Sequence, residues 1–239
     1  MRKHPYQQLL DRKRTWTPVQ PTKGKVKDGA EETLYRALAV RNMELPVGEF
    51  LKEAIKEVPD TARELLLSNV KDEERHDVAL GYIAKAHGVD EQAEAEAVRL
   101  RDAWTAHPDH TLLKALIVER AVFFVILPFF RFTGDTGMRV TSADIGRDET
   151  IHVSSGSLVT RELGLRYSPS LDKLRKATVN WIFQPLKNNA EDRYLNRQFW
   201  MDQSDNLMYS GKTEGLADTR RARVPAFFET SNSDLPSYA

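Results

Sequence analysis

Two short motifs in this sequence combine a carboxylate with an imidazole at helical spacing. The first runs from Glu73 to His76 and the second from Glu149 to His152, and each reads Glu-x-x-His. Side chains three residues apart share one face of a helix, so each motif can offer both groups to the same metal ion. Such pairs also arise by chance in a chain rich in Glu, and on their own they only suggest a metal site.

A further candidate ligand, Glu119, lies inside the most apolar stretch of the chain, residues 112–127. An unpaired carboxylate buried there would be strongly destabilising, so it must be protonated, paired with an arginine or bound to a metal. For Glu119 in isolation, a buried salt bridge with an arginine explains the position as well as a metal does. The presence of two Glu-x-x-His motifs favours the metal.

A helical bundle that holds two metal ions takes one carboxylate from each of two helices and a Glu-x-x-His motif from each of the other two. The missing carboxylate is then expected in the first helix. Glu44 fits best, because it lies 29 residues before the first motif, and Glu119 lies 30 residues before the second. Glu49 and Glu53 are alternatives. Four carboxylates and two imidazoles suit iron or manganese better than a softer metal.

The elements that must position these residues are helices. Apolar residues recur at steps of three and four, and predicted helices cover about 30–45, 49–58, 61–86, 90–106, 109–132 and 138–163, with weaker stretches at 169–186 and 189–209. Pro46 is expected to break or kink the first helix, and Asp60 to cap the third. Strand alternation is missing, so the sequence predicts an all-α fold. Long helices with short connections predict a bundle.

The chain divides into three parts by composition. Residues 1–28 are basic and contain three prolines, which predicts an extended N-terminal arm. Residues 29–215 hold the predicted helices and should form the helical domain. Residues 216–239 are polar and predict a C-terminal tail that docks on a partner.

Composition and charge exclude other classes of function. The 35 Lys and Arg balance 35 Asp and Glu, so bulk electrostatics do not favour a nucleic-acid partner, and the absence of Cys removes thiol chemistry and disulfides. Residues 112–132 resemble a membrane span in hydropathy, but charges near the centre, Glu119 and Arg120, are expensive in a bilayer. We therefore expect a helix buried in protein and no membrane partner. The N-terminus has no secretory signal, which predicts a cytoplasmic protein.

At the candidate ligands, the sequence resembles the small (beta, radical-generating) subunit of class I ribonucleotide reductase, a family of the ferritin-like di-metal carboxylate superfamily. Residues 147–152, Arg-Asp-Glu-Thr-Ile-His, are similar to its Arg-Asp-Glu-x-x-His signature, and residues 113–124 resemble the helix in which a ligand Glu is followed by aromatic residues. Residues 15–18 (Thr-Trp-Thr-Pro) and 224–229 (Val-Pro-Ala-Phe-Phe-Glu) are similar to segments near its two ends. The resemblance is firm over about 60–155.

This resemblance implies a ferritin-like helical bundle with a di-metal site in its four-helix core, and a role for each candidate residue. Asp148 would accept a hydrogen bond from His76 and, together with Trp16, carry an oxidising equivalent out of the site. Tyr238 in the tail would continue that route to the large (alpha) subunit. The implied metal ligands are Glu44, Glu73, His76, Glu119, Glu149 and His152.

The implied function is that of a ribonucleoside-diphosphate reductase subunit. Its two transition-metal ions, Mn and/or Fe, would be oxidised and would supply a one-electron oxidant to a cysteine of the large subunit, for making the deoxyribonucleotides of DNA replication. The absence of Cys in this chain fits that division of labour. The family also implies a homodimer.

One position departs from the family pattern. Most members carry a radical-storing Tyr four residues after the first motif histidine, where this chain has Leu80, and the nearest tyrosine, Tyr82, lies about 200° further around the helix. Either the oxidant is stored on the metals, or Tyr82 serves from a displaced position. We favour storage on the metals, which makes an Mn/Fe or Mn/Mn centre as good a candidate as a di-iron centre. The chain is also shorter than usual for the family.

Two other functions are compatible with the same motifs. One is a self-contained di-metal oxygenase on the same fold, aldehyde-deformylating or hydroxylating, with an apolar substrate channel that Phe123, Phe124 and Phe130 could line. The other is a metal-storing bundle, which does not need the roughly 75 residues after residue 164. A radical-delivering subunit needs a docking tail, so the C-terminus discriminates between the ribonucleotide reductase subunit and the self-contained oxygenase.

Overall fold

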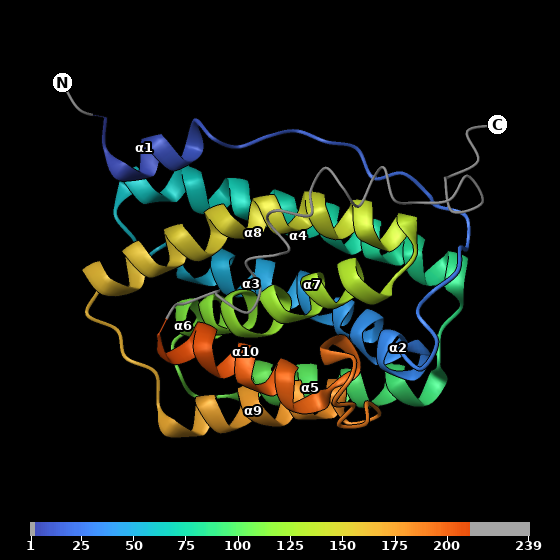
Figure 1. The fold of residues 1–239 in the computed structure, drawn as a ribbon. Coiled ribbons are helices and arrows are strands. Elements are labelled where there is room, and N and C mark those ends of the chain that lie inside the picture. Colours follow the sequence, from blue (N-terminus) through green and yellow to red (C-terminus); the bar gives the residue numbers. More distant parts are fainter. Residues whose placement is uncertain (1–2, 211–239) are drawn as a thin grey trace.

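The computed structural model describes residues 3–210, and these residues form helices joined by loops (Figure 1). Within this range the only β pairing is one isolated bridge, between Asn188 and Asn196. The predicted all-α class is therefore confirmed for the described residues. The elements are α1 (Pro5–Leu10), α2 (Glu31–Ala39), η1 (Val40–Met43), α3 (Glu44–Ala54), α4 (Asp60–His87), α5 (Glu91–Ala106), α6 (Thr111–Val118), η2 (Glu119–Phe123), α7 (Phe124–Thr133), α8 (Thr136–Glu162), α9 (Pro169–Phe183), η3 (Arg193–Leu195) and α10 (Arg197–Tyr209).

The helices are arranged in three layers (Figure 1). The long helices α4 and α8 lie side by side in the first layer, the run α2–α3 and the run α6–α7 form the second, and α5, α9 and α10 cover the far side. Helix α3 packs on α4 and α6, while α8 packs on α4, α6 and α7. Four helical stretches thus surround one common core.

The first helical stretch continues through Pro46. A 3₁₀ turn, η1, joins α2 to α3, and Pro46 is the third residue of α3. Proline is tolerated in the first turn of a helix, where backbone N–H groups commonly lack an intrahelical acceptor. The predicted interruption therefore exists, but it lies at η1, a few residues before Pro46, and the separate helix predicted at 49–58 is instead α3, which begins at Glu44. Glu44 begins α3 instead of ending the helix before it.

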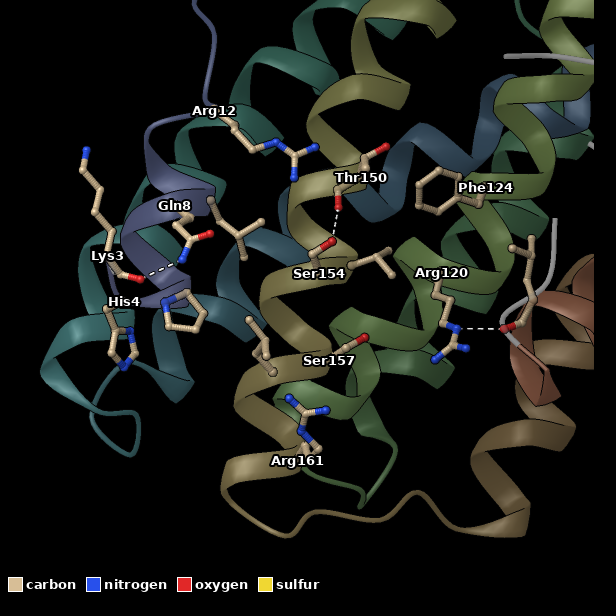
Figure 2. Close-up of a pocket in the computed structure, with 15 residues that line it drawn as sticks. Lys3, His4, Gln8, Arg12, Arg120, Phe124, Thr150, Ser154, Ser157 and Arg161 are labelled. Atoms are coloured by element: carbon tan, nitrogen blue, oxygen red, sulfur yellow. Dashed lines mark hydrogen bonds between the residues drawn. The ribbon is translucent and has the colours of Figure 1, made fainter. Parts of the chain in front are cut away.

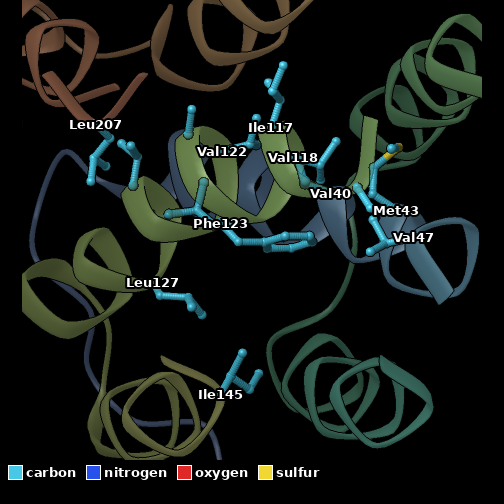
Figure 3. Packing of buried hydrophobic residues seen from close by; sticks show 14 of the residues in the cluster. Val40, Met43, Val47, Ile117, Val118, Val122, Phe123, Leu127, Ile145 and Leu207 are labelled. Carbon is cyan, nitrogen blue, oxygen red and sulfur yellow. The ribbon is translucent and has the colours of Figure 1, made fainter. Parts of the chain in front are cut away.

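The apolar stretch forms one helical run buried in the protein. Elements α6, η2 and α7 follow one another from Thr111 to Thr133, and their apolar side chains, among them Val118 and Phe123, pack against residues of η1 and α3 such as Val40 (Figure 3). η2 is a π turn that begins at Glu119. None of the helices within residues 3–210 combines the length and the apolarity needed to cross a bilayer.

The N-terminal arm is not extended throughout, as predicted for 1–28. Its first described residues form α1, whose N-terminus is capped by the His4 side chain. Tyr6 and Leu9 are buried where α1 packs on α4 and α8, and the Tyr6 hydroxyl donates to Glu162 at 2.7 Å. Burial of these two side chains holds a short helix that is unstable alone. Beyond α1 the arm is irregular and runs along α4 and α8 (Figure 1).

Other predicted boundaries shift by a few residues. Asp60 is the first residue of α4, and Pro59 occupies the cap position, so Asp60 does not cap the helix. The stretch predicted as a helix over 189–209 contains the 3₁₀ turn η3 and becomes α-helical only at Arg197, where the Asn196 side chain accepts a hydrogen bond from the Phe199 N–H group. The predicted tail, residues 216–239, lies outside the described residues.

Candidate metal centre

Six buried side chains from four helical stretches meet in the core. Each is at most 1% exposed. The structure therefore brings all the predicted ligands into one cluster. They are Glu44 at the start of α3, Glu73 and His76 on α4, Glu119 at the start of η2, and Glu149 and His152 on α8.

The cluster contains two groups that share Glu73. Position 1 consists of Glu44, Glu73, His76 and Glu149, and position 2 consists of Glu73, Glu119 and His152; within each, the potential ligand atoms lie within 4.8 Å of one another. Glu149 also faces both histidines, with Oε1 3.4 Å from His76 Nδ1 and Oε2 3.6 Å from His152 Nδ1. Two carboxylates thus lie between two imidazoles, as in a site with two bridged ions.

The polar atoms of this cluster face one another at ion-pair distances, the shortest being 2.8 Å between His152 Nδ1 and Glu73 Oε1. Among the described residues, both carboxylate oxygens of Glu44, Glu73 and Glu149 are buried without a hydrogen-bond partner, as are Oε1 of Glu119 and Nδ1 of both histidines. An unpaired buried polar atom costs about 1–3 kcal/mol, and more when charged. Metal ions would satisfy these atoms, and two divalent cations would balance four carboxylates. The oxygen and imidazole donors therefore fit metal binding.

No arginine among the described residues forms an ion pair with Glu119. Its ionic partner is His152, whose Nδ1 lies 3.7 Å from Glu119 Oε1. The neighbouring Arg120 points the other way and donates from Nε to the backbone oxygen of Leu207 at 2.7 Å. The salt bridge considered as an explanation of this buried carboxylate is therefore not formed in the described part of the chain.

Burial and crowding shift the pKa values of the ligands. Burial raises the pKa of Glu44 and of Glu119, and nearby carboxylates raise both further. Burial opposes protonation of His76 and His152, but the surrounding carboxylates outweigh it and raise the pKa of both histidines well above the usual value. Burial likewise works against ionised Glu73, yet the two histidines hold its pKa below the usual range. Without metal, the cluster thus retains protons that metal ions would displace.

The outer ring nitrogen of His76 faces Asp148. His76 Nε2 lies 3.4 Å from Asp148 Oδ2, and Trp16 Nε1 donates to the same oxygen at 2.7 Å. Despite burial, these two contacts hold the pKa of Asp148 below its usual value. A carboxylate on Nε2 fixes the tautomer that turns Nδ1 to the cluster. The contacts form a continuous path from the arm through Trp16, Asp148 and His76 to position 1.

His152 has a matching acceptor, Asp72, which is absent from the predicted set. His152 Nε2 lies 3.1 Å from Asp72 Oδ2. The sequence does carry the signal, because residues 71–76 and 147–152 share the pattern of a basic residue followed by Asp-Glu-x-x-His. Asp72 also accepts Arg75 Nη1 at 2.7 Å and forms an ion pair with Lys13 of the arm. Lys13 and Arg75 have no comparable signal in the sequence.

The alternatives to Glu44 point away from the cluster. Glu49 and Glu53 are exposed on α3, and Glu49 pairs with Lys52 at 2.7 Å. Both lie on the same helix as Glu44, but a helix turns by about 100° per residue, so five and nine residues later the side chain faces elsewhere. Glu44 is therefore the carboxylate that the first helical run brings to the cluster.

Of the two candidate tyrosines the structure describes Tyr82, which is not part of the cluster. Leu80, one turn beyond His76, is 1% exposed and occupies the face of α4 that turns inward. Tyr82 is half-buried and lies about 120° around the helix from His76, with no hydrogen bond to a described ligand. Tyr238 lies outside the described residues.

A groove of about 1030 Å³ lies on the outer side of α8, between α1 and the run η2–α7 (Figure 2). Its charged lining residues are all basic, and none of the six clustered ligands lines it. Phe124 does line this groove, whereas Phe123 and Phe130 are packed in the core. These three phenylalanines therefore do not line one common channel.

The sequence was compared with protein-family models and with curated proteins. No known protein family matches the sequence, and no curated protein is significantly similar to it.

Proposed function

We propose that this chain is the beta subunit of a class I ribonucleotide reductase, built on a ferritin-like bundle that holds two transition-metal ions, Mn and/or Fe, at positions 1 and 2. The observation that carries the proposal is the path from Trp16 through Asp148 to His76. A metal-storing bundle needs the six ligands but has no use for an indole hydrogen-bonded to the partner of a ligand. A subunit that delivers an oxidant needs both.

When bound and oxidised, the metal pair would supply a one-electron oxidant. Trp16 is half-buried, with its ring centroid 6.3 Å from that of His76, which is close enough for an electron to pass inward from the indole. Asp148 Oδ2 holds the indole N–H at 2.7 Å and can take that proton as the electron leaves. Electron and proton would thus leave the indole together without leaving a buried cation behind.

The oxidant would act on a second protein. This chain has no Cys, so the thiol that starts nucleotide reduction must belong to the large (alpha) subunit. We assign the continuation of the path to Tyr238 and the docking of the large subunit to residues 216–239, and we expect the chain to work as a homodimer.

Storage of the oxidant would fall to the metals. Leu80 cannot be oxidised in the way a tyrosine can, and Tyr82 lies on another face of α4 from His76. The proposal therefore includes no stable tyrosyl radical.

The self-contained oxygenase is less well supported. It needs a substrate cavity that opens on the metal ligands, and the large groove of Figure 2 touches none of the six. Phe123 and Phe130, which could line such a cavity, are at most 1% exposed and pack in the core.

The proposal is tested by loading the metal-free chain with Fe, Mn or both and exposing it to oxidant. Two metals per chain, with a metal-centred electron paramagnetic resonance signal and no tyrosyl signal, are expected. Fewer than two metals under every condition would contradict the di-metal site. A tyrosyl signal would contradict storage on the metals and would support storage on Tyr82.

A further inference from the structure

The two histidine–aspartate pairs beside the cluster are alike in sequence but unlike in charge. At position 1, Asp148 meets the neutral indole of Trp16, and the nearest cation, Arg75 Nη1, is 3.6 Å away. At position 2, Asp72 meets two cations in direct contact, Lys13 and Arg75. The partner of His152 is therefore neutralised far more completely than the partner of His76.

Lys13 is the residue that makes the difference. It comes from the arm three residues before Trp16, and its side chain is only 10% exposed. A buried ammonium is destabilising unless it is paired, and its partner Asp72 is itself only 4% exposed. Its charge also reaches Glu119 and His152, the two residues that belong to position 2 alone.

We propose that Lys13 is a positioning residue that makes position 2 the weaker of the two metal positions, so that a divalent ion fills position 1 first. The inference rests on the proposed metal-binding function and deepens it. It concerns the order in which ions load and the unequal chemistry of the two positions, which the set of six ligands does not determine.

Two physical effects of Lys13 act in the same direction. A positive charge close to position 2 repels a divalent cation directly, and little water is present to screen it. An aspartate already paired with an ammonium also draws the Nε2 proton of His152 less strongly, which makes Nδ1 a poorer electron donor to a metal. Both effects are weaker at position 1, because among the described residues Asp148 meets one cation, Arg75, at the longer distance of 3.6 Å.

The test is a titration of the metal-free full-length chain with Mn²⁺, in which free Mn²⁺ is followed by electron paramagnetic resonance. The natural chain is expected to bind two ions in two steps, with dissociation constants at least about tenfold apart. Lys13→Gln removes the charge but keeps a donor for Asp72, and it should tighten the second step by about tenfold while leaving the first unchanged. Lys13→Met should do the same.

Two further variants separate charge from packing. Lys13→Arg keeps the charge and should restore the two-step titration of the natural chain. Lys25→Gln is a matched control on the same arm, because Lys25 is 79% exposed and pairs only loosely with Asp28. It should change neither step.

The outcomes distinguish this inference from the proposed function. If Lys13→Gln leaves both steps unchanged, or weakens both alike, Lys13 serves only to hold the arm, and the inference is wrong. Two ions bound with equal affinity by the natural chain would also overturn it, while the di-metal function would stand. If the natural chain binds no Mn²⁺, Fe²⁺ or Co²⁺, the inference about Lys13 and the proposed di-metal function are both wrong.

Discussion

Glu119 is a buried carboxylate that receives little support from the protein itself. Its Oε1 is buried without a hydrogen bond, and its ionic partner, His152 Nδ1, is 3.7 Å away. At the scale of single residues, the chemistry of the cluster therefore depends on carboxylate atoms that the protein itself leaves unsatisfied. Both carboxylate oxygens of Glu44 are likewise buried without a hydrogen-bond partner.

Replacing Glu119 by Ala is expected to lower the bound metal from two ions per chain to one, because Glu119 belongs to position 2 and not to position 1. Metal analysis after loading and desalting measures the change. Glu74→Ala is the matched control, since Glu74 follows ligand Glu73 but its side chain is 59% exposed. Unchanged metal content in Glu119→Ala would show that this carboxylate is buried for another reason.

Trp16→Phe is expected to separate metal binding from the delivery of the oxidant. The phenyl ring keeps most of the packing but cannot donate to Asp148, so two metals should still bind while nucleotide reduction with the large subunit falls by about 100-fold. Trp181→Phe is the control, because Trp181 lies on α9, away from the cluster, with the guanidinium of Arg36 from α2 over its ring. Equal activity in the two variants would remove Trp16 from the path.

At the scale of elements, the position of Glu119 depends on the π turn η2 and on its support by α10. A π turn interrupts the regular hydrogen-bond register of a helix and is frequent at functional sites. Ser204 of α10 donates to the Ala121 backbone oxygen inside this turn at 2.7 Å, and Arg175 Nη1 donates to Ser204 Oγ at 2.7 Å. α10 therefore stabilises the turn that begins with a ligand.

Ser204→Ala should test this support. Two buried hydrogen bonds are lost, so the free energy of unfolding of the metal-free chain should fall by about 2 kcal/mol in urea denaturation. Binding at position 2 should weaken more than binding at position 1. Ser157→Ala is the control, because its hydroxyl forms no hydrogen bond with a described residue. An equal effect of both substitutions would mean that α10 does not support η2.

Sequence periodicity was sufficient to predict most helices, since apolar spacing reports directly on which face is buried. It could not predict the π turn at Glu119, because the donor that stabilises it, Ser204, is 83 residues from Ala121. Spacing between motifs placed Glu44 in the cluster, ahead of Glu49 and Glu53, although the helix is interrupted at η1 and not at Pro46. Lys13 could not be predicted, because only the folded arm brings it to Asp72.

At the scale of the whole molecule, the proposed delivery of an oxidant would require a contact with a large subunit, whereas metal binding would not. Deleting residues 231–239 is therefore expected to abolish nucleotide reduction while two metals still bind. Activity and metal content measured on the same preparation check this. Retained activity would show that these residues do not dock the partner.

The stability of the metal-free chain should depend on pH, through the buried carboxylates and imidazoles of the cluster. Glu44 and Glu119 have pKa values raised above 4.5, and His76 and His152 have pKa values raised above 6.5. Above these ordinary values the folded metal-free chain binds more protons than the unfolded chain, so its stability falls as pH rises through the raised values. Glu73, whose pKa is lowered, affects stability only below about pH 4.5.

Metal ions need the same groups deprotonated, so their affinity rises over the range in which the metal-free chain loses stability. The rise in Tm caused by Mn²⁺ should therefore be larger at pH 8 than at pH 6, as thermal denaturation with Mn²⁺ or with a chelator can measure. At 100 times the dissociation constant, one bound ion adds about 2.7 kcal/mol to the free energy of unfolding. A rise in Tm that is equal at both pH values, or larger at pH 6, would mean that the buried carboxylates and imidazoles are not the metal ligands.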